Sequence, residues 1–219
     1  NFHATYLNVY AEWSGNIKKL NYRLSLGAVQ GRYSQGENVE KRLLPTTRVR
    51  LGYNVNDNFN IRFNGSLSYN PPELGNMGNV SQIIDSLQIR KGNPNLHESK
   101  VYITNMAVNY QKGLFSTNLN IYYQYCKNAM MESIFLDNNH FIHTTENQKS
   151  WQKITPQLEL KVGPIKDILN ISLATGVNYY DSKGLNYHHS YTNWYYRFET
   201  SAMYKNWMAM FMIQNQQRT

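Results

Sequence analysis

Cysteine is nearly absent from this sequence, and long hydrophobic runs are absent altogether. The single cysteine, Cys126, cannot form an intramolecular disulfide, so no disulfide framework holds the fold. A mean hydropathy of −0.61 and the lack of any stretch of about 20 apolar residues exclude a transmembrane helix. The first residues also lack the basic, apolar and small-residue segments of a signal peptide. We therefore expect any targeting segment to lie outside these residues.

Acidic residues are scarce relative to basic ones. The chain has 22 Lys and Arg but only 14 Asp and Glu, which gives a net charge of +8. A basic chain is a candidate for nucleic-acid binding. Here, however, the basic residues fall in short turns and at alternate positions of the predicted strands, with no basic helix and no RNA-binding aromatic motif. We therefore predict solvated turns and a basic sheet face, and no nucleic-acid partner.

Motifs for catalysis or metal binding are also lacking. The sequence contains no nucleotide-binding glycine loop, nucleophile elbow or zincin motif. His140 and His143 are three residues apart, so in a strand their side chains point to opposite faces, and no cysteine or acidic ligand lies near either at a metal-binding spacing. We predict no catalytic residue, no metal and no cofactor, and therefore no enzyme.

What is present is an alternation of apolar and polar residues along nearly the whole chain. In residues 60–70, NIRFNGSLSYN, the side chains of Ile61, Phe63, Leu67 and Tyr69 alternate with polar ones. A period of two indicates a strand with one dry and one wet face. The same pattern predicts about ten strands, at 7–13, 20–28, 47–55, 61–69, 102–110, 115–125, 154–162, 169–179, 194–204 and 207–213. We expect a bulge or another irregularity at Pro156, inside one of these strands.

The connections between these strands alternate in length. Short turns are predicted at 14–19, 56–58, 111–113, 163–167 and 205–206. Longer excursions are predicted at 31–45, 71–97 and 182–191, and a tight hairpin near 137–139 has extended arms from about 129 to 147. This is an all-β, antiparallel up-and-down meander with two different ends. Bacterial outer-membrane barrels have short periplasmic turns and long extracellular loops in this arrangement.

Aromatic residues on the dry face fall into two belts. Near the short turns they are Trp13, Tyr22, Tyr53, Tyr110, Phe115, Tyr204 and Trp207. Near the long connections they are Tyr69, Tyr102, Tyr123, Tyr125, Tyr179, Trp194 and Tyr196. Membrane barrels place aromatic girdles at both lipid–water interfaces, whereas a soluble core has no reason to sort its aromatics in this way. We therefore predict that the dry face meets outer-membrane lipid and that the wet face lines a lumen.

Residues 92–96, GNPNL, followed by His97 and Glu98, resemble the GNPNLKPE-type segment of TonB-dependent receptors. The resemblance is strongest to the outer-membrane β-barrel family abundant in Bacteroidetes, and the earlier segment 69–74, YNPPEL, is similar to that family's strand-to-loop segment. Here His97 stands in place of the usual basic residue, and no proline follows it. The resemblance implies a barrel of about 22 strands around a plug, energised by the TonB system. It also implies uptake of a nutrient such as chelated iron, a glycan, a peptide or a vitamin across the bacterial outer membrane.

The sequence shows neither a plug-like segment nor a TonB box, and its last residues, Gln216 to Thr219, do not form a terminal aromatic strand. We therefore expect residues 1–219 to be a single segment from inside a larger barrel, with the plug and the TonB system as partners implied by the family. The alternative is a soluble β-rich adhesin or carbohydrate-binding module. That alternative requires a second sheet packed against the dry face.

The candidate ligand-binding residues are mostly basic. A tight turn that pairs Asn54 with Asn60 places Arg48, Arg50 and Arg62 on one face of one hairpin. One interpretation is that these arginines pair with lumen carboxylates such as Glu12, or with plug residues. The other is that they make the lumen electropositive and attract an anionic solute. Four further residues, expected in the long connections, are predicted to contact the ligand: Tyr33, Tyr187, His188 and His189.

Overall fold

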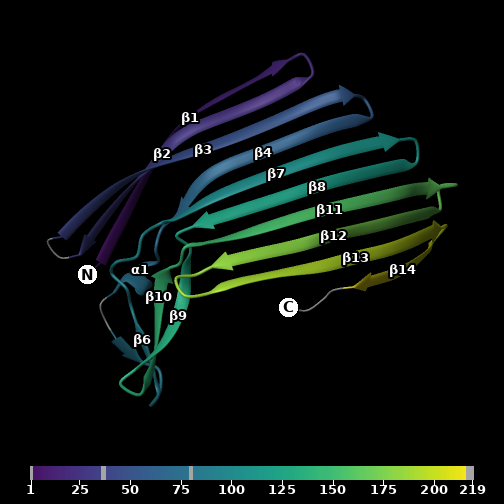
Figure 1. Ribbon diagram of the computed structural model, residues 1–219. Coiled ribbons are helices and arrows are strands. Elements are labelled where there is room, and N and C mark those ends of the chain that lie inside the picture. Colours follow the sequence, from purple (N-terminus) through teal and green to yellow (C-terminus); the bar gives the residue numbers. More distant parts are fainter. Residues whose placement is uncertain (1, 36–37, 79–80, 216–219) are drawn as a thin grey trace.

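One broad antiparallel sheet forms most of the molecule (Figure 1). The computed structural model describes residues 2–35, 38–78 and 81–215. Ten strands follow one another across this sheet: β1 (Phe2–Ile17), β2 (Leu20–Gln35), β3 (Asn38–Asn56), β4 (Phe59–Asn70), β7 (Ser99–Lys112), β8 (Phe115–Lys127), β11 (Ser150–Ile165), β12 (Leu169–Lys183), β13 (His188–Tyr204) and β14 (Trp207–Asn215). The predicted meander of about ten strands is confirmed. Within the described residues, β1 and β14 form the two edges.

A second sheet of four strands is built from the two longest connections, and we call it the loop sheet. The connection between β4 and β7 supplies α1 (Leu74–Met77), β5 (Ser81–Ile83) and β6 (Gln88–Lys91). The connection between β8 and β11 supplies β9 (Met130–Asp137) and β10 (His140–Asn147), joined by the predicted tight hairpin. A parallel pair of strands, β6 and β10, joins the two connections. In Figure 1 the loop sheet lies at the end opposite the short turns.

Two of the predicted long excursions are wrong, because the strands continue through them. β2 and β3 stay paired as far as Gln35 and Asn38, so most of 31–45 is strand. β12 and β13 stay paired as far as Lys183 and His188, which leaves only residues 184–187 between them. Pairing needs only backbone hydrogen bonds, so a hairpin can extend past the point where one of its faces stops being apolar.

The irregularity expected at Pro156 is a local gap in the pairing with β12, between Ile154 and Gln157, and it is not a bulge. Pro156 lies opposite Ile121 of β8, and that register runs unbroken along the strand. On the β12 side the pairing resumes at Gln157 in the same register. The missing N–H of proline therefore costs hydrogen bonding without adding a residue. The register shift in β11 lies instead between Val162 and Ile165, just before the short turn.

The apolar face of the large sheet is exposed. Leu26 is 69% exposed and Trp207 is 81% exposed, although a soluble protein would bury such side chains. Strand pairing brings the predicted belt residues next to one another. Near the short turns, the rings of Tyr110 and Phe115 have centroids 6.3 Å apart, and Phe59, which is not among the predicted belt residues, extends the contact with its centroid 6.5 Å from that of Tyr110. In the described part of the chain, no second sheet packs on this face to form the core that a soluble module requires.

The GNPNL segment ties the loop sheet to the large sheet. Leu96 is fully buried, with 0% exposure. Asn93 donates its backbone N–H to the carbonyl of Asn76 at 2.7 Å and its side-chain amide to the carbonyl of Thr145 at 3.0 Å. Asn147 of β10 bonds both the N–H and the carbonyl of His97, each at 2.8 Å. One short motif thus fixes α1 and β10 in place.

Within the described residues, no helix has the length and apolar character needed to cross a membrane.

Candidate functional site

The polar face of the large sheet carries a cationic hollow of about 550 Å³ beside the short turns of β1–β4. Its lining includes Arg23 of β2, Arg50 of β3 and Arg62 of β4. Arg23 lies directly opposite Arg50, and Arg62 lies opposite Gly52, one diagonal step from Arg50. Three guanidinium groups therefore converge on one hollow. We call this the arginine hollow.

The predicted arrangement of the arginines is confirmed by the strand register. Asn54 pairs with Asn60, so Arg48, Arg50 and Arg62 share one face. Arg48 lies opposite Ser25 and Ser66, further from the short turns, and does not line the hollow. Sequence reasoning missed Arg23, because the register between β2 and β3 was hidden by the supposed long excursion.

The charge of the arginine hollow is poorly compensated. Glu12 contacts Arg23, with Oε1 and Nε 3.5 Å apart, and both side chains are substantially exposed. Exposed ion pairs of this kind contribute about 0–1 kcal/mol. Across residues 2–35, 38–78 and 81–215, no ion pair or hydrogen bond engages the guanidinium of Arg48, Arg50 or Arg62. The predicted pairing with Glu12 is thus made by Arg23 instead, and the other three remain available to an anion.

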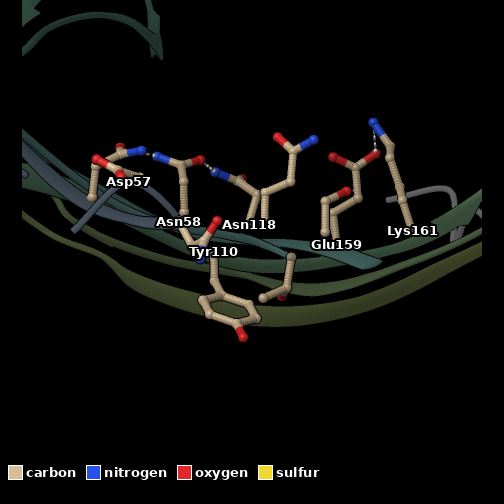
Figure 2. Close-up of a pocket in the computed structure, with 11 residues that line it drawn as sticks. Asp57, Asn58, Tyr110, Asn118, Glu159 and Lys161 are labelled. Carbon is tan, nitrogen blue, oxygen red and sulfur yellow. Dashed lines mark hydrogen bonds and ion pairs between the residues drawn. The ribbon is translucent and has the colours of Figure 1, made fainter. Parts of the chain in front are cut away.

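A second hollow, of about 210 Å³, lies beside the first and is lined by amides (Figure 2). Asn118 donates to Asn109, and Asn109 donates to Asn60 at 3.0 Å. Glu159 and Lys161 form an ion pair of 3.0 Å along the same face. Figure 2 shows these polar side chains on one side of the sheet and Tyr110 on the other. We call these asparagine side chains the amide row. The sequence analysis missed the amide row, although asparagine at alternate positions of β4, β7 and β8 was its signal.

Tyr33 belongs to a buried cluster near the loop end, and its expected loop location is wrong. It lies in β2 and is 4% exposed. Its hydroxyl donates to Glu98 Oε1 at 2.8 Å and accepts from Tyr6 at 3.2 Å. Arg42 binds the other oxygen of Glu98 at 2.7 Å. Burial, together with these partners, raises the pKa of the Tyr33 hydroxyl far above its ordinary value. The cluster explains why Glu98 follows the GNPNL motif.

The remaining candidates lie at the loop end of β12 and β13, away from the arginine hollow. Tyr187 lies in the short connection and donates to Met131 Sδ at 3.2 Å. His188 and His189 are in β13, so their predicted loop location is wrong. His188 bonds Asp181, and the ring of His189 stacks on Tyr187 with centroids 5.3 Å apart. The structure therefore does not bring these residues together with the arginines. In the part of the chain that the structure describes, no group of three potential metal ligands is found.

Comparison with solved structures shows the same fold in transporters. The FrpB iron transporter from Neisseria meningitidis superposes with a TM-score of 0.67 at 11% identity, over 93% of this chain and 31% of that chain. The copper transporter OprC gives a TM-score of 0.71 at 9% identity, over 96% of this chain and 35% of that one. The outer membrane transporter YddB from Escherichia coli gives 0.56 at 8% identity, over 97% and 33%.

This chain therefore spans about a third of the length of these transporters. No curated protein sequence matches it. The model of a family described as "Outer membrane protein beta-barrel family" matches residues 1–217, which is nearly the whole sequence. Together with an exposed apolar face and a polar opposite face, this match places the strands in the bacterial outer membrane. The chain belongs to the outer membrane protein beta-barrel family.

Proposed function

We propose that this chain forms part of the wall of a TonB-dependent-receptor-like barrel that takes up a nutrient carrying negative charge. The observation that carries the proposal is the arginine hollow, where the guanidinium groups of Arg50 and Arg62 face the lumen side without carboxylate partners among the described residues. Similarity of fold to iron and copper transporters supports a role in uptake. The identity of the nutrient is open to any solute with exposed carboxylate, phosphate or similar oxygens.

The physical basis is electrostatic attraction at close range. Like charges on neighbouring strands are unfavourable unless a counter-charge is present. A wall lined by one sign of charge raises the local concentration of oppositely charged solutes and their rate of arrival. Arginine also binds carboxylate and phosphate through paired N–H donors, which adds geometric selectivity. The neighbouring amide row offers further neutral donors and acceptors to the same solute.

The partners follow from the family resemblance. We propose that residues 1–219 are a single barrel segment that encloses a plug domain and is driven by the TonB system. The arginine hollow lies at the short-turn end, which is the periplasmic end in outer-membrane barrels. An acidic segment of the plug is therefore the alternative occupant of the hollow. In that case the arginines stabilise the closed barrel rather than bind the solute.

The test is a triple variant, Arg48→Gln, Arg50→Gln and Arg62→Gln, in the protein reconstituted into lipid vesicles. Binding of citrate, a polyvalent anion, is compared with binding of neutral glucose at about 0.01 M and 0.15 M salt, where the Debye length falls from about 30 to 8 Å. Citrate binding should weaken in the variant, most of all at low salt, while glucose is unaffected. Lys166→Gln, in a short turn, is a control for the removal of one basic side chain outside the hollow. Unchanged citrate binding together with a lower unfolding midpoint would favour the plug instead.

A further inference from the structure

A separate polar pocket of about 340 Å³ lies in the loop sheet, where it meets α1. Its lining includes Arg90 and Lys91 of β6, Gln82 of β5, and His143 of β10. Small-ligand pockets have volumes of about 300–1,000 Å³ and a few convergent polar groups. This pocket has a volume in that range and convergent polar groups, but its own lining is polar and the apolar surface lies beside it. We propose that it binds the anionic group of a flat, partly apolar ligand such as an aromatic carboxylate.

Strand register places the donors in one row. Gln82 pairs with Arg90 across β5 and β6, and Arg90 pairs with His143 across β6 and β10. Directly paired residues project from the same face of a sheet. An amide, a guanidinium and an imidazole therefore stand side by side on adjacent strands. Arginine next to other N–H donors is the usual recognition element for carboxylate and phosphate oxygens.

The charge balance of the pocket is positive. Glu132 is the acidic residue in its lining, and its Oε1 lies 3.0 Å from His143 Nδ1. That contact holds the imidazole in place. Among the described residues, no ion pair uses Arg90 or Lys91. Two cationic residues and one carboxylate therefore line the pocket. Arg90 lies on the face of the donor row, whereas Lys91, the next residue on β6, projects from the opposite face. Arg90 is thus the cation that an incoming anion meets directly.

The pocket is built before any ligand arrives. A Cβ on Gly92, in its lining, would overlap the carbonyl oxygen of Gly78, so the two backbones touch. Asn93 holds both Asn76 and Thr145, which belong to the lining as well. The GNPNL motif, anchored by the buried Leu96, thus fixes the distance between α1 and the loop sheet. Preorganisation of this kind lowers the entropic cost of binding.

An apolar surface continues from the pocket along the same sheet face. Phe141 lies two residues before His143 on β10, about 7 Å away, and is 48% exposed. Its paired residue on β9 is Leu136, which is 64% exposed. A ligand whose anionic group sits beside Arg90 can therefore lay a ring against Phe141. The site lies at the loop end of the molecule, and the inference does not rest on the arginine hollow at the other end.

The experiment uses 2-naphthoate as the probe, with 2-naphthol lacking the anionic group and acetate lacking the ring. Binding to the reconstituted protein is measured by titration calorimetry, after subtraction of the heat with protein-free vesicles. We expect 2-naphthoate to bind at least tenfold more tightly than either analogue. Arg90→Gln should weaken 2-naphthoate at least tenfold, and Phe141→Ser should weaken it while leaving acetate unchanged. Both side chains are exposed, so both variants should fold.

The matched control is Arg197→Gln, which removes an exposed arginine from β13 in the large sheet. It should leave 2-naphthoate binding unchanged. Equal loss in the Arg90 and Arg197 variants would mean that net charge alone attracts the probe, and would overturn the proposal. Equal affinity for 2-naphthoate and 2-naphthol, or no binding of 2-naphthoate at millimolar concentration, would overturn it too. If the Arg90→Gln variant binds citrate as tightly as the unchanged protein does, the pocket in the loop sheet and the arginine hollow are independent sites.

Discussion

Replacing Leu158 with arginine should destabilise the barrel in lipid by about 2–4 kcal/mol, the cost of a lipid-facing arginine at the bilayer midplane. The depth of Leu158 follows from strand register. It lies four residues along β11 from Ile154, which pairs with Tyr123 of the aromatic belt near the long connections, here called the outer belt. It lies four residues from Val162, which pairs with Phe115 of the belt near the short turns, here called the inner belt. At about 3.3 Å per residue and a strand tilt of about 40°, each belt is about 10 Å away along the membrane normal.

The matched control is Gln157→Arg on the adjacent position of the same strand. Gln157 projects from the polar face, opposite Asn120 and Gly176. The arginine introduced at position 157 has the same charge and the same side-chain length as the one at position 158 but stays in water. The free energy of unfolding should therefore change by less than about 1 kcal/mol. The contrast isolates the face on which the charge lies. Local strand propensity contributes nearly equally to both variants.

The assay is urea unfolding of the protein in lipid vesicles, followed by tryptophan fluorescence and analysed by linear extrapolation. A third variant, Leu67→Arg, tests depth, because Leu67 lies only two residues from Tyr69, about 5 Å inside the outer belt. Its cost should fall between those of the other two. If Gln157→Arg costs as much as Leu158→Arg, or more, the assignment of the lipid face is refuted.

Three further changes test the connections and the buried clusters. Gly92→Ala should lower the free energy of unfolding in the same urea titration by about 1–3 kcal/mol, because the new Cβ would overlap a backbone carbonyl. Gly52→Ala is its control and should be nearly neutral, since a Cβ on Gly52 meets nothing closer than 3.8 Å. Tyr33→Phe should cost about 1–3 kcal/mol in that titration, because a buried carboxylate loses a donor. The hydrogen bond from His188 lowers the pKa of the Asp181 carboxyl. The ionised carboxylate therefore stabilises the β12–β13 hairpin at pH values above the ordinary pKa of Asp, and this stabilisation is lost as the pH falls through the lowered pKa. In His188→Gln the loss should begin at higher pH, seen as faster hydrogen exchange in the hairpin, and an unchanged pH profile would contradict this reasoning.

Most of the large sheet could be predicted because lipid imposes a strict alternation on the strands that cross it. In 60–70 and 115–125 every second residue faces lipid, so the period of two is read directly from the sequence. Beyond the outer belt that constraint ends. Arg32 and Lys183 lie in paired strand although the alternation has stopped, and so the strand ends were missed. The hydrogen-bond ladder carries no sequence signal of its own there.

The site was predicted where local geometry determined it and missed where distant segments meet. The tight turn between β3 and β4 was enough to place Arg50 and Arg62 on one face. Arg23 depends on the β2–β3 pairing, which was not foreseen. The cluster around Glu98 joins residues far apart in the sequence, with Tyr33 in β2 and Arg42 in β3. No periodic pattern reports such a contact.

The parallel pairing of β6 with β10 joins the two longest connections into one structural unit. Each connection alone supplies two strands, and only their joining at Ile89 and Ile142 completes the loop sheet. A chimera that exchanges one connection for that of a relative would leave an unpaired strand edge in the other. Exchange of both together would keep the sheet intact. Insertions, deletions and recombination breakpoints in this family should therefore spare or replace the two connections jointly, and changes of ligand preference should arrive as paired replacements rather than in single loops.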